Sequence, residues 1–526
     1  MLKQINCTKL ALIPKIQSPQ SVSEFRPIAC CNTLYKVITK LIFSRLKPIL
    51  PHIIADNQAG FIQGRQIFHN ISIVQDLVGA YNKKATPPYC MLKVDIRKAY
   101  DSVDWNFLQE MLHALKFPQQ FIGWIMACVS TATYSLCLNG SIQGFFPGKR
   151  GLTQGDPMSP LLFVICMEYL SRLMKCAGMQ DNYQFHHRCK RVGLNHLVFA
   201  DDLIIFCKGD YDSIMWNIRS LATFAATSGL NANASKSAIY TCNMDADLKN
   251  KILQETKYVE ESLPFTYIGV KISSKRLNQD DCQFLIDKIG AKLRSWGSRT
   301  LSYVGRAQLV NSVLLNLHTY WASIFVLPTK VIDGVIRACR NYLWDGKLES
   351  NKSPLIAWDL ICRDKKKGGM GFKESHTWNT ALLGKYIWSI ACKEDNMWVK
   401  WIDHVYLKGK DWKNYAPSSN VSWYWRQLTH IKDKFRAGYG GNKWLFDKKG
   451  YSATNGYNWL RQDQEEVVWD KWVWNRLNIP KHSFLCWVIM WGRIQTRDRL
   501  IKMGLQVDQS CPNCGAYPET ADHVMV

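Results

Sequence analysis

The chain has 526 residues, of which 47% are hydrophobic and 21% are charged. Its length predicts several domains, and this composition excludes a disordered, collagen-like or coiled-coil protein. Lysine and arginine outnumber aspartate and glutamate by 67 to 42, and so basic a chain favours a polyanionic partner, either nucleic acid or an anionic membrane face.

A membrane is the less favoured of these two partners. Residues 1–14 lack the basic region, apolar run and small-residue cleavage site of a signal peptide. The longest uncharged stretch, residues 307–329, contains Asn311 and His318, which would be costly at bilayer depth. We therefore expect a nucleic-acid partner, no membrane partner, and a packed helix in this stretch.

The first third of the chain alternates between strand-like and helix-like patterns. Residues 89–96 alternate, with Leu92 and Val94 on one face and Lys93 and Asp95 on the other, which predicts a β-strand. Apolar residues at helical spacing predict helices over residues 37–50, 103–115 and 159–174, the last beginning at Ser159-Pro160.

Residues 196–207 contain two short apolar runs on either side of Ala200-Asp201-Asp202, which predicts a β-hairpin with two carboxylates at its tip. Carboxylates beside core strands are costly unless they are paired or bind a metal, and Mg²⁺ prefers such hard oxygen ligands. With Asp95 close by, the three carboxylates would suit two Mg²⁺ ions about 3.5–4 Å apart that catalyse an in-line displacement. For an Asp-Asp pair alone, a plain turn is the simpler interpretation.

Helical patterns dominate after about residue 275. Residues 281–296, 302–320 and 329–344 predict a three-helix unit. From residue 351 the chain is rich in tryptophan and lysine and contains a glycine-rich loop at 365–371. No Gly-Lys-Ser/Thr sequence follows this loop, so we reject a nucleotide-hydrolase interpretation.

Several short motifs occur together in a characteristic order. They are Lys93-Val94-Asp95-Ile96 with Ala99-Tyr100-Asp101, Gly151-Leu152-Thr153-Gln154-Gly155-Asp156-Pro157, and Phe199-Ala200-Asp201-Asp202. Flanking blocks are Leu12-Ile13-Pro14-Lys15, Phe25-Arg26-Pro27-Ile28, Gly60-Phe61-Ile62 with Gly64-Arg65, Gly229-Leu230 with Asn233 and Lys236, and Tyr267-Ile268-Gly269. The set resembles the reverse transcriptases of plant non-LTR (LINE-type) retrotransposons.

This resemblance implies an α+β fold of the right-hand polymerase type. Fingers and palm, with an antiparallel palm sheet, would occupy residues 1–275, and a helical thumb would occupy residues 276–350. A basic, tryptophan-rich helical linker region would span residues 351–465. A truncated zinc-binding-like region would span residues 466–526.

The implied function is RNA-directed DNA polymerase, with an RNA template, a DNA primer and dNTPs as partners and the nucleus as location. Two Mg²⁺ ions would assist transfer of a nucleotide from dNTP to the primer 3′-hydroxyl. Elements of this type carry an endonuclease ahead of the polymerase, and nothing before Leu10 leaves room for one, so target-primed integration would need a separate endonuclease.

Three other interpretations stay open. The chain would be a catalytically inactive nucleic-acid-binding relic if too much of the fingers is missing. An RNA-copying RNA polymerase shares the carboxylates but is disfavoured by Tyr100, and a group II intron-type maturase is disfavoured by the tail.

By the same resemblance, Asp95, Asp201 and Asp202 are the catalytic residues that bind Mg²⁺. The ring of Tyr100 would lie against the sugar of the incoming nucleotide and exclude a ribose 2′-hydroxyl. A tyrosine that merely packs in the core is the alternative.

Four further residues are expected to contact the nucleotide. Gln154 and Gly155 would form the loop beneath it, where the alternative is a plain turn before a helix. Arg65 would pair with triphosphate oxygens and Lys236 would neutralise the leaving pyrophosphate. A surface arginine and a surface lysine are the alternatives.

Basic residues in the expected thumb, Lys288, Lys292, Arg294 and Arg299, would follow the phosphates of the primer and template, unless they only form a solvated face.

The tail contains Cys511, Cys514 and His523 at zinc-like spacing. It resembles the zinc-binding end of plant LINE proteins, whose pattern continues to a fourth ligand, a cysteine. Here the sequence stops at Val526, and three ligands predict a weak or exchangeable zinc site.

Overall fold

The computed structural model describes residues 4–84, 86–296, 301–350, 352–419, 421–436, 450–461 and 465–525. The chain divides into two compact units. The first contains Met1–Lys275 and Lys393–Tyr415, and the second contains Arg276–Cys392 and Ala416–Val526. The finer division expected at residues 275, 350 and 465 stays a prediction.

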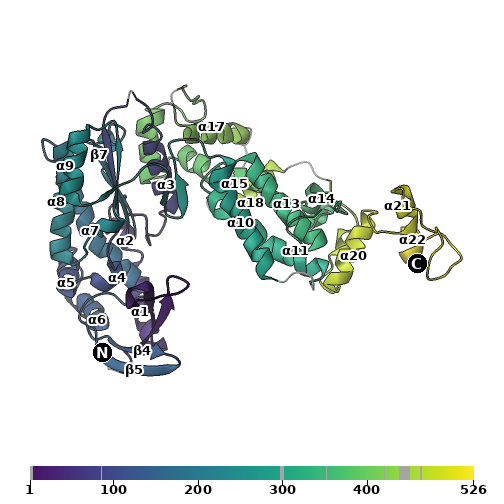
Figure 1. The fold of residues 1–526 in the computed structure, drawn as a ribbon, viewed down its shortest axis with the longest axis horizontal. Helices are drawn as coiled ribbons and strands as arrows, with labels where there is room; N and C mark the ends of the chain where they lie inside the picture. The colour runs from purple at the N-terminus through teal and green to yellow at the C-terminus, as the bar shows by residue number, and fades with distance from the viewer. Residues whose placement is uncertain are drawn as a thin grey trace. The chain divides into compact units, whose positions relative to one another are not determined.

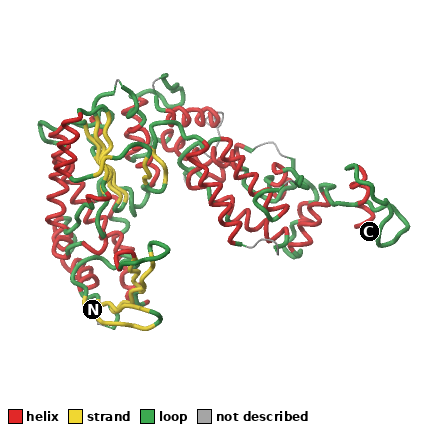
Figure 2. Tube along the Cα trace, viewed as in Figure 1, coloured by secondary structure: helices red, strands yellow, loops and turns green. Residues whose placement is uncertain are grey.

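A five-stranded sheet forms the centre of the first unit (Figures 1 and 2). Its strand order is β6-β7-β3-β8-β9, and its neighbours are antiparallel except for the parallel pair β8–β9. The strands are β3 (Tyr89–Val94), β6 (His196–Phe199), β7 (Asp202–Lys208), β8 (Ala238–Cys242) and β9 (Val259–Glu260). The predicted strand and the predicted hairpin are both confirmed.

The alternation in β3 divides its side chains between the two faces of this sheet. Leu92 and Val94 belong to the main hydrophobic core, as does Phe163 of a covering helix. On the other face, the Lys93 ammonium donates to the carbonyl of Thr266 (3.0 Å), beneath the hairpin of β10 (Phe265–Tyr267) and β11 (Val270–Ile272). The helices of this region are α3 (Ile67–Val78), α4 (Ala99–Ser102), α5 (Trp105–Ala114), α7 (Ser159–Ala177), α8 (Tyr211–Ser228) and α9 (Ala246–Thr256).

A second sheet lies near the N-terminus of the same unit, with strand order β2-β1-β4-β5. Strands β1 and β4 run parallel, although they are far apart in the sequence. The elements are β1 (Cys7–Pro14), β2 (Phe25–Cys30), β4 (Thr133–Leu138) and β5 (Ser141–Pro147), with helices α1 (Thr33–Leu46), α2 (Leu50–Ile53) and α6 (Gln119–Ser130). Together the two sheets and their helices confirm the expected α+β fold with a mainly antiparallel central sheet.

A short segment from later in the chain packs against α3. Within it, α16 (Met397–Ile402) places the buried Trp398 against His69, with ring centroids 5.9 Å apart and planes 10° from parallel. Next to α16, Tyr406 donates a hydrogen bond of 2.6 Å to Asp76. Residues 393–415 therefore complete the first unit, which their position in the expected linker region did not predict.

The second unit is helical in the part that the structure describes. Its longer helices are α10 (Gln279–Ser295), α11 (Tyr303–Ser312), α13 (Thr329–Asp345), α15 (Ser375–Ala391), α17 (Trp423–Phe435), α18 (Ala453–Leu460) and α20 (Pro480–Met490). Its shorter helices are α12 (Thr319–Ala322), α14 (Trp358–Ile361), α19 (Asp470–Val473), α21 (Arg497–Lys502) and α22 (Ala521–Met525). Helices α10 and α11 both pack on α13, as expected for a three-helix unit.

The predicted helix over residues 302–320 is interrupted. Helix α11 ends at Ser312, and a 3₁₀ turn over Leu314–Asn316 precedes α12. The amide of Asn316 donates to the carbonyls of Asn311 (3.2 Å) and Ser312 (3.0 Å). A side chain that takes up carbonyls at a helix end favours termination there.

The glycine-rich loop at 365–371 has a packing role in the second unit. The carbonyl of Gly368 accepts hydrogen bonds from the indoles of Trp487 (2.7 Å) and Trp491 (2.9 Å). Gly368 itself has a φ of +81°, which glycine adopts without strain. Among the described residues, no helix has the length and apolar character needed to cross a membrane.

Candidate active site

Strand pairing brings Asp95 and Asp202 to the same end of the central sheet. The antiparallel ladder of β3 and β7 pairs Lys93 with Ile204 and then Val94 with Leu203. The ladder ends at this pair, and beyond it Asp95 is the next residue after β3 and Asp202 is the first residue of β7. Asp201 precedes it in the tight turn that links β6 to β7, so residues about 100 positions apart in the sequence meet at one edge.

The three carboxylates interact electrostatically. Burial raises the pKa of Asp202, and the negative charges of Asp201 and Asp95 raise it further, whereas Lys93 opposes the shift. Such repulsion among hard oxygen ligands is what a divalent cation relieves, so this donor set fits Mg²⁺. The oxygen atoms of the three carboxylates do not all lie within 4.8 Å of one another. Among the described residues, only a cysteine–histidine group in the tail has its ligand atoms that close together.

Asp95 is held by the segment before β8. Its backbone carbonyl accepts from the amide of Asn233 (2.7 Å), and its backbone N–H donates to the hydroxyl of Ser237 (3.1 Å). The side chain of Asn233 donates to the Asp95 carboxylate at 3.3 Å. Lys236 belongs to the same short turn and is exposed. Its ammonium group is therefore carried by the segment that supports Asp95.

Tyr100 lies on the first turn after β3. Its ring stacks on Phe163 of α7, with centroids 5.0 Å apart, and the side chain is only partly buried. Burial raises the pKa of Tyr100 to about 12, and the charge of Asp201 contributes to this shift. The tyrosine is therefore close to the carboxylates and not enclosed in the core.

The loop at 151–155 packs against the N-terminal sheet. The carbonyl of Gln154 accepts from the amide of Ala29 in β2 at 2.9 Å. Gly155 has a φ of +114°, and a Cβ atom there would lie 2.8 Å from the Ala29 carbonyl oxygen, so only glycine fits without strain. A cavity of about 460 Å³ opens between this loop and strands β2, β4 and β5, and Gln154 and Arg150 are among its lining residues.

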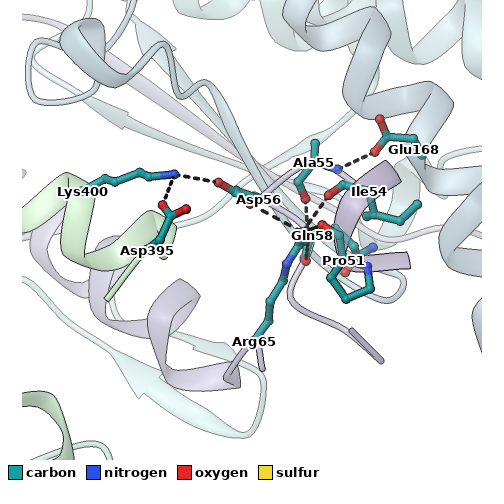
Figure 3. A network of polar contacts seen from close by, with 9 residues as sticks. All are labelled: Pro51, Ile54, Ala55, Asp56, Gln58, Arg65, Glu168, Asp395 and Lys400. Atoms are coloured by element: carbon teal, nitrogen blue, oxygen red, sulfur yellow. Dashed lines mark hydrogen bonds and ion pairs between the residues drawn. The ribbon is translucent and has the colours of Figure 1, made fainter. Parts of the chain in front are cut away.

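Arg65 does not face open solution (Figure 3). Its guanidinium donates to the carbonyls of Ala55 (2.5 Å), Ile54 (2.7 Å) and Gln58 (2.7 Å), and its side chain is 13% exposed. A further contact of 3.5 Å reaches the carboxylate of Asp56. These acceptors occupy most of the guanidinium, and the role of Arg65 as a triphosphate ligand stays a prediction.

The tail brings Cys511, Cys514 and His523 together in the second unit. The Sγ atom of Cys514 lies 3.2 Å from Nε2 of His523, and Cys511 is buried. Hydrogen bonds from the backbone of Ala516 and Tyr517 lower the pKa of Cys514 to about 7, with a smaller contribution from His523. A thiolate formed this readily suits a zinc ligand.

The basic residues expected on the thumb lie at the C-terminal half of α10. Lys288 sits over the ring of Phe284, 5.1 Å from its centroid, and Lys292 and Arg294 lie in the last turn. Arg299 falls outside the residues that the structure describes.

Two family models match this chain. Residues 13–272 match the reverse transcriptase (RNA-dependent DNA polymerase) family, and residues 451–526 match the zinc-binding region in reverse transcriptase. The first match contains every segment of the carboxylate site. Residues 13–272 are a reverse transcriptase domain.

Similar proteins include retrotransposon proteins of animals. A Xenopus laevis transposon TX1 protein is 26% identical over 391 residues, which cover 72% of this chain and 29% of that protein. The Drosophila melanogaster R2DM retrotransposable-element polyprotein is 26% identical over 232 residues, which cover 44% and 21%. This chain therefore spans less than a third of either relative. A Candida tropicalis telomerase structure, solved with a fragment of telomeric RNA, aligns over 88% of this chain and 65% of that chain, with 13% identity and a TM-score of 0.40.

Two residues that contact the site of the reverse transcriptase domain were given no role from sequence. Asn233 binds Asp95, and Gln58 accepts a hydrogen bond from the backbone N–H of Ala200, next to Asp201. Both lie in blocks that carry the family resemblance or border on one. The motifs therefore pointed to these two positions. They did not reveal the contacts, because the partner of each residue is far away along the chain.

Proposed function

We propose that this chain is an RNA-directed DNA polymerase of a LINE-type retroelement. The observation that carries the proposal is the pairing of β3 with β7, which ends at Val94 and Leu203 and so brings the neighbouring Asp95 and Asp202 to one end of the sheet, within a reverse transcriptase domain. An RNA template, a DNA primer and dNTPs are the partners that this activity requires.

Asp95, Asp201 and Asp202 would hold two Mg²⁺ ions. When bound, the ions would activate the primer 3′-hydroxyl and stabilise charge on the leaving pyrophosphate. The chain itself contributes the orientation of these carboxylates. Asn233 fixes Asp95 through two hydrogen bonds, and the sheet fixes Asp202 at the start of β7.

Other residues would select and orient the nucleotide. Tyr100, supported by Phe163, would present its ring to the sugar and exclude a ribose 2′-hydroxyl. Gln154 and Gly155 would form the floor beneath the base, and Lys236 would neutralise the pyrophosphate. Arg65 is a weaker candidate for a triphosphate ligand, because backbone carbonyls already engage its guanidinium.

Cys511, Cys514 and His523 in the tail would bind Zn²⁺. A match to the zinc-binding region of reverse transcriptases supports this assignment. A plant source and a nuclear location complete the proposal, and both rest on the family resemblance.

The test is a primer-extension assay with purified protein, a DNA primer on an RNA template, dNTPs and Mg²⁺. We expect extension by the wild-type chain and by Asp247→Asn, which alters an exposed carboxylate on α9, and no extension by Asp201→Asn. An inactive relic would instead bind nucleic acid in a salt-dependent way without extension. Equal extension by wild type and Asp201→Asn would also refute the assignment.

A further inference from the structure

The turn that carries Asp201 contains a residue in an unfavourable backbone conformation. Ala200 has a φ of +56°, in the left-handed region that residues with a Cβ atom rarely adopt. Ala200 is buried. Surrounding contacts must therefore hold this residue in place, because an isolated turn of this sequence would relax to a negative φ.

Gln58 supplies the contact that holds Ala200. Its side-chain Oε1 accepts the backbone N–H of Ala200 at 3.1 Å and the backbone N–H of Gly60 at 2.8 Å. Gln58, Gly60 and Ala200 are all buried, and Gln58 is only 1% exposed, so water does not readily replace this acceptor. One buried oxygen thus holds the Phe199–Ala200 peptide, which lies one residue before Asp201.

Backbone pairing aligns the segment around Gln58 with β6. The N–H of Val198 donates to the carbonyl of Asn57 (2.9 Å), and the N–H of Ala59 donates to the carbonyl of Val198 (3.0 Å). Close packing follows at Gly60, where a Cβ atom would lie 2.4 Å from the backbone nitrogen of Ala200. The segment therefore lies directly against the turn.

Arg65 and Glu168 also hold this segment (Figure 3). The guanidinium of Arg65 donates to the backbone carbonyl of Gln58 itself, and Glu168 of α7 accepts the backbone N–H of Ala55 at 2.8 Å. Both side chains act on the backbone. Gln58 is thereby held at a fixed position from which its own side chain reaches Ala200.

We propose that Gln58 is a positioning residue that holds Ala200 in its left-handed conformation and so directs the carboxylates of Asp201 and Asp202 toward a shared divalent cation. This inference rests on the proposed metal site of the polymerase. Without the Gln58 oxygen, Ala200 relaxes, the peptide before Asp201 rotates, and the carboxylates lose their common orientation.

The test measures Mn²⁺ binding directly, from the electron paramagnetic resonance signal of free Mn²⁺, with the component that Asp201→Asn removes taken as the carboxylate site. We expect Gln58→Met, which keeps the volume but has no acceptor, to weaken this component by roughly 10- to 100-fold. Gln75→Met is the matched control. Gln75 is also buried in the first unit, but it bonds the backbone of Ser273, and its loss should leave Mn²⁺ binding unchanged.

A second variant separates positioning from a general loss of stability. Glycine adopts a positive φ without strain, so Ala200→Gly should restore most of the Mn²⁺ affinity that Gln58→Met loses. Wild-type affinity in Gln58→Met, an equal loss in Gln75→Met, or no recovery in the double variant would each overturn the inference. Because Mn²⁺ binding needs no turnover, a wild-type chain that fails to extend a primer would refute the proposed polymerase activity and leave this test intact.

Discussion

The ring of Tyr100 stacks on the ring of Phe163, with centroids 5.0 Å apart and planes inclined by 21°. This contact fixes the tyrosine ring from one side, while the partial exposure of the residue leaves the ring accessible from elsewhere. Asp201 is close enough for its charge to raise the pKa of the phenol. A rigid aromatic surface therefore lies beside the carboxylates, as exclusion of a ribose 2′-hydroxyl requires.

We expect Tyr100→Ala to admit ribonucleotides, because the obstacle to the 2′-hydroxyl is the ring. Tyr100→Phe keeps the ring and its stacking on Phe163, so it should retain discrimination and serves as the control. The measurement is the ratio of kcat/KM for a dNTP to that for the matching rNTP. An unchanged ratio in Tyr100→Ala would show that this residue does not select the sugar.

Asp202 should destabilise the protein when no divalent cation is bound. Its pKa is raised in the folded state by burial and by its carboxylate neighbours, so its protonated form favours folding. That contribution is complete below the unfolded-state pKa of about 3.9 and is lost as the pH rises through the raised folded value. At neutral pH the ionised group therefore costs stability.

Asp202→Asn should accordingly raise the melting temperature at pH 7 in EDTA, by roughly 2–4 °C for each kcal/mol of repulsion removed. Mg²⁺ should stabilise the wild type more than the variant, so the difference between their melting temperatures should become smaller. Thermal unfolding with EDTA and with Mg²⁺ measures both effects. A variant that melts below the wild type in EDTA would contradict the repulsion inferred here.

Substitution of Arg65 tests whether this residue stabilises the fold or binds the triphosphate of the nucleotide. Its guanidinium binds the carbonyls of Ala55, Ile54 and Gln58, and Arg65→Met would leave the carbonyls of the buried Ile54 and Gln58 unpaired at a cost of roughly 3 kcal/mol. Thermal unfolding should show this loss, whereas Arg45→Met, which alters an exposed arginine on α1, should not change the melting temperature. A variant with wild-type stability but a raised KM for dNTPs would instead favour the triphosphate role.

Zinc binding at Cys511, Cys514 and His523 should depend on pH. The pKa of Cys514 is lowered to about 7, so affinity should rise as the pH passes upward through this value and this thiol ionises. Cys514→Ser should weaken binding, and Cys392→Ser, at another exposed cysteine of the second unit, should not. A pH-independent affinity would contradict the role of this thiol.

Local patterns predicted the elements that carry the carboxylates. Alternation identified β3 and the hairpin of β6 and β7, and the position of Asp95 at the end of one strand and Asp201 at the hairpin tip made their convergence a specific expectation. Burial of Leu92 and Val94 on a single face of β3 fixes the register between β3 and β7. This register brings Asp95 toward the hairpin tip.

The supporting contacts were not predictable in the same way. Gln58 and Arg65 bind backbone atoms, which every residue offers, so residue type alone does not reveal their partners. The break after α11 depends on the side chain of Asn316, and the docking of Trp398 on His69 joins segments more than 300 residues apart. Such tertiary contacts override the local helical pattern or lie outside it.

The central claim is that Asp95 and the Asp201-Asp202 turn share one cation site. Fe²⁺ in place of Mg²⁺, with ascorbate and peroxide, generates hydroxyl radicals that cleave the backbone next to the bound ion. We predict cleavage near both Asp95 and Asp201 in the wild type, suppressed by excess Mg²⁺ and lost at both places in Asp201→Asn. Cleavage at only one of the two segments, or cleavage that persists near Asp95 in Asp201→Asn, would contradict a shared site.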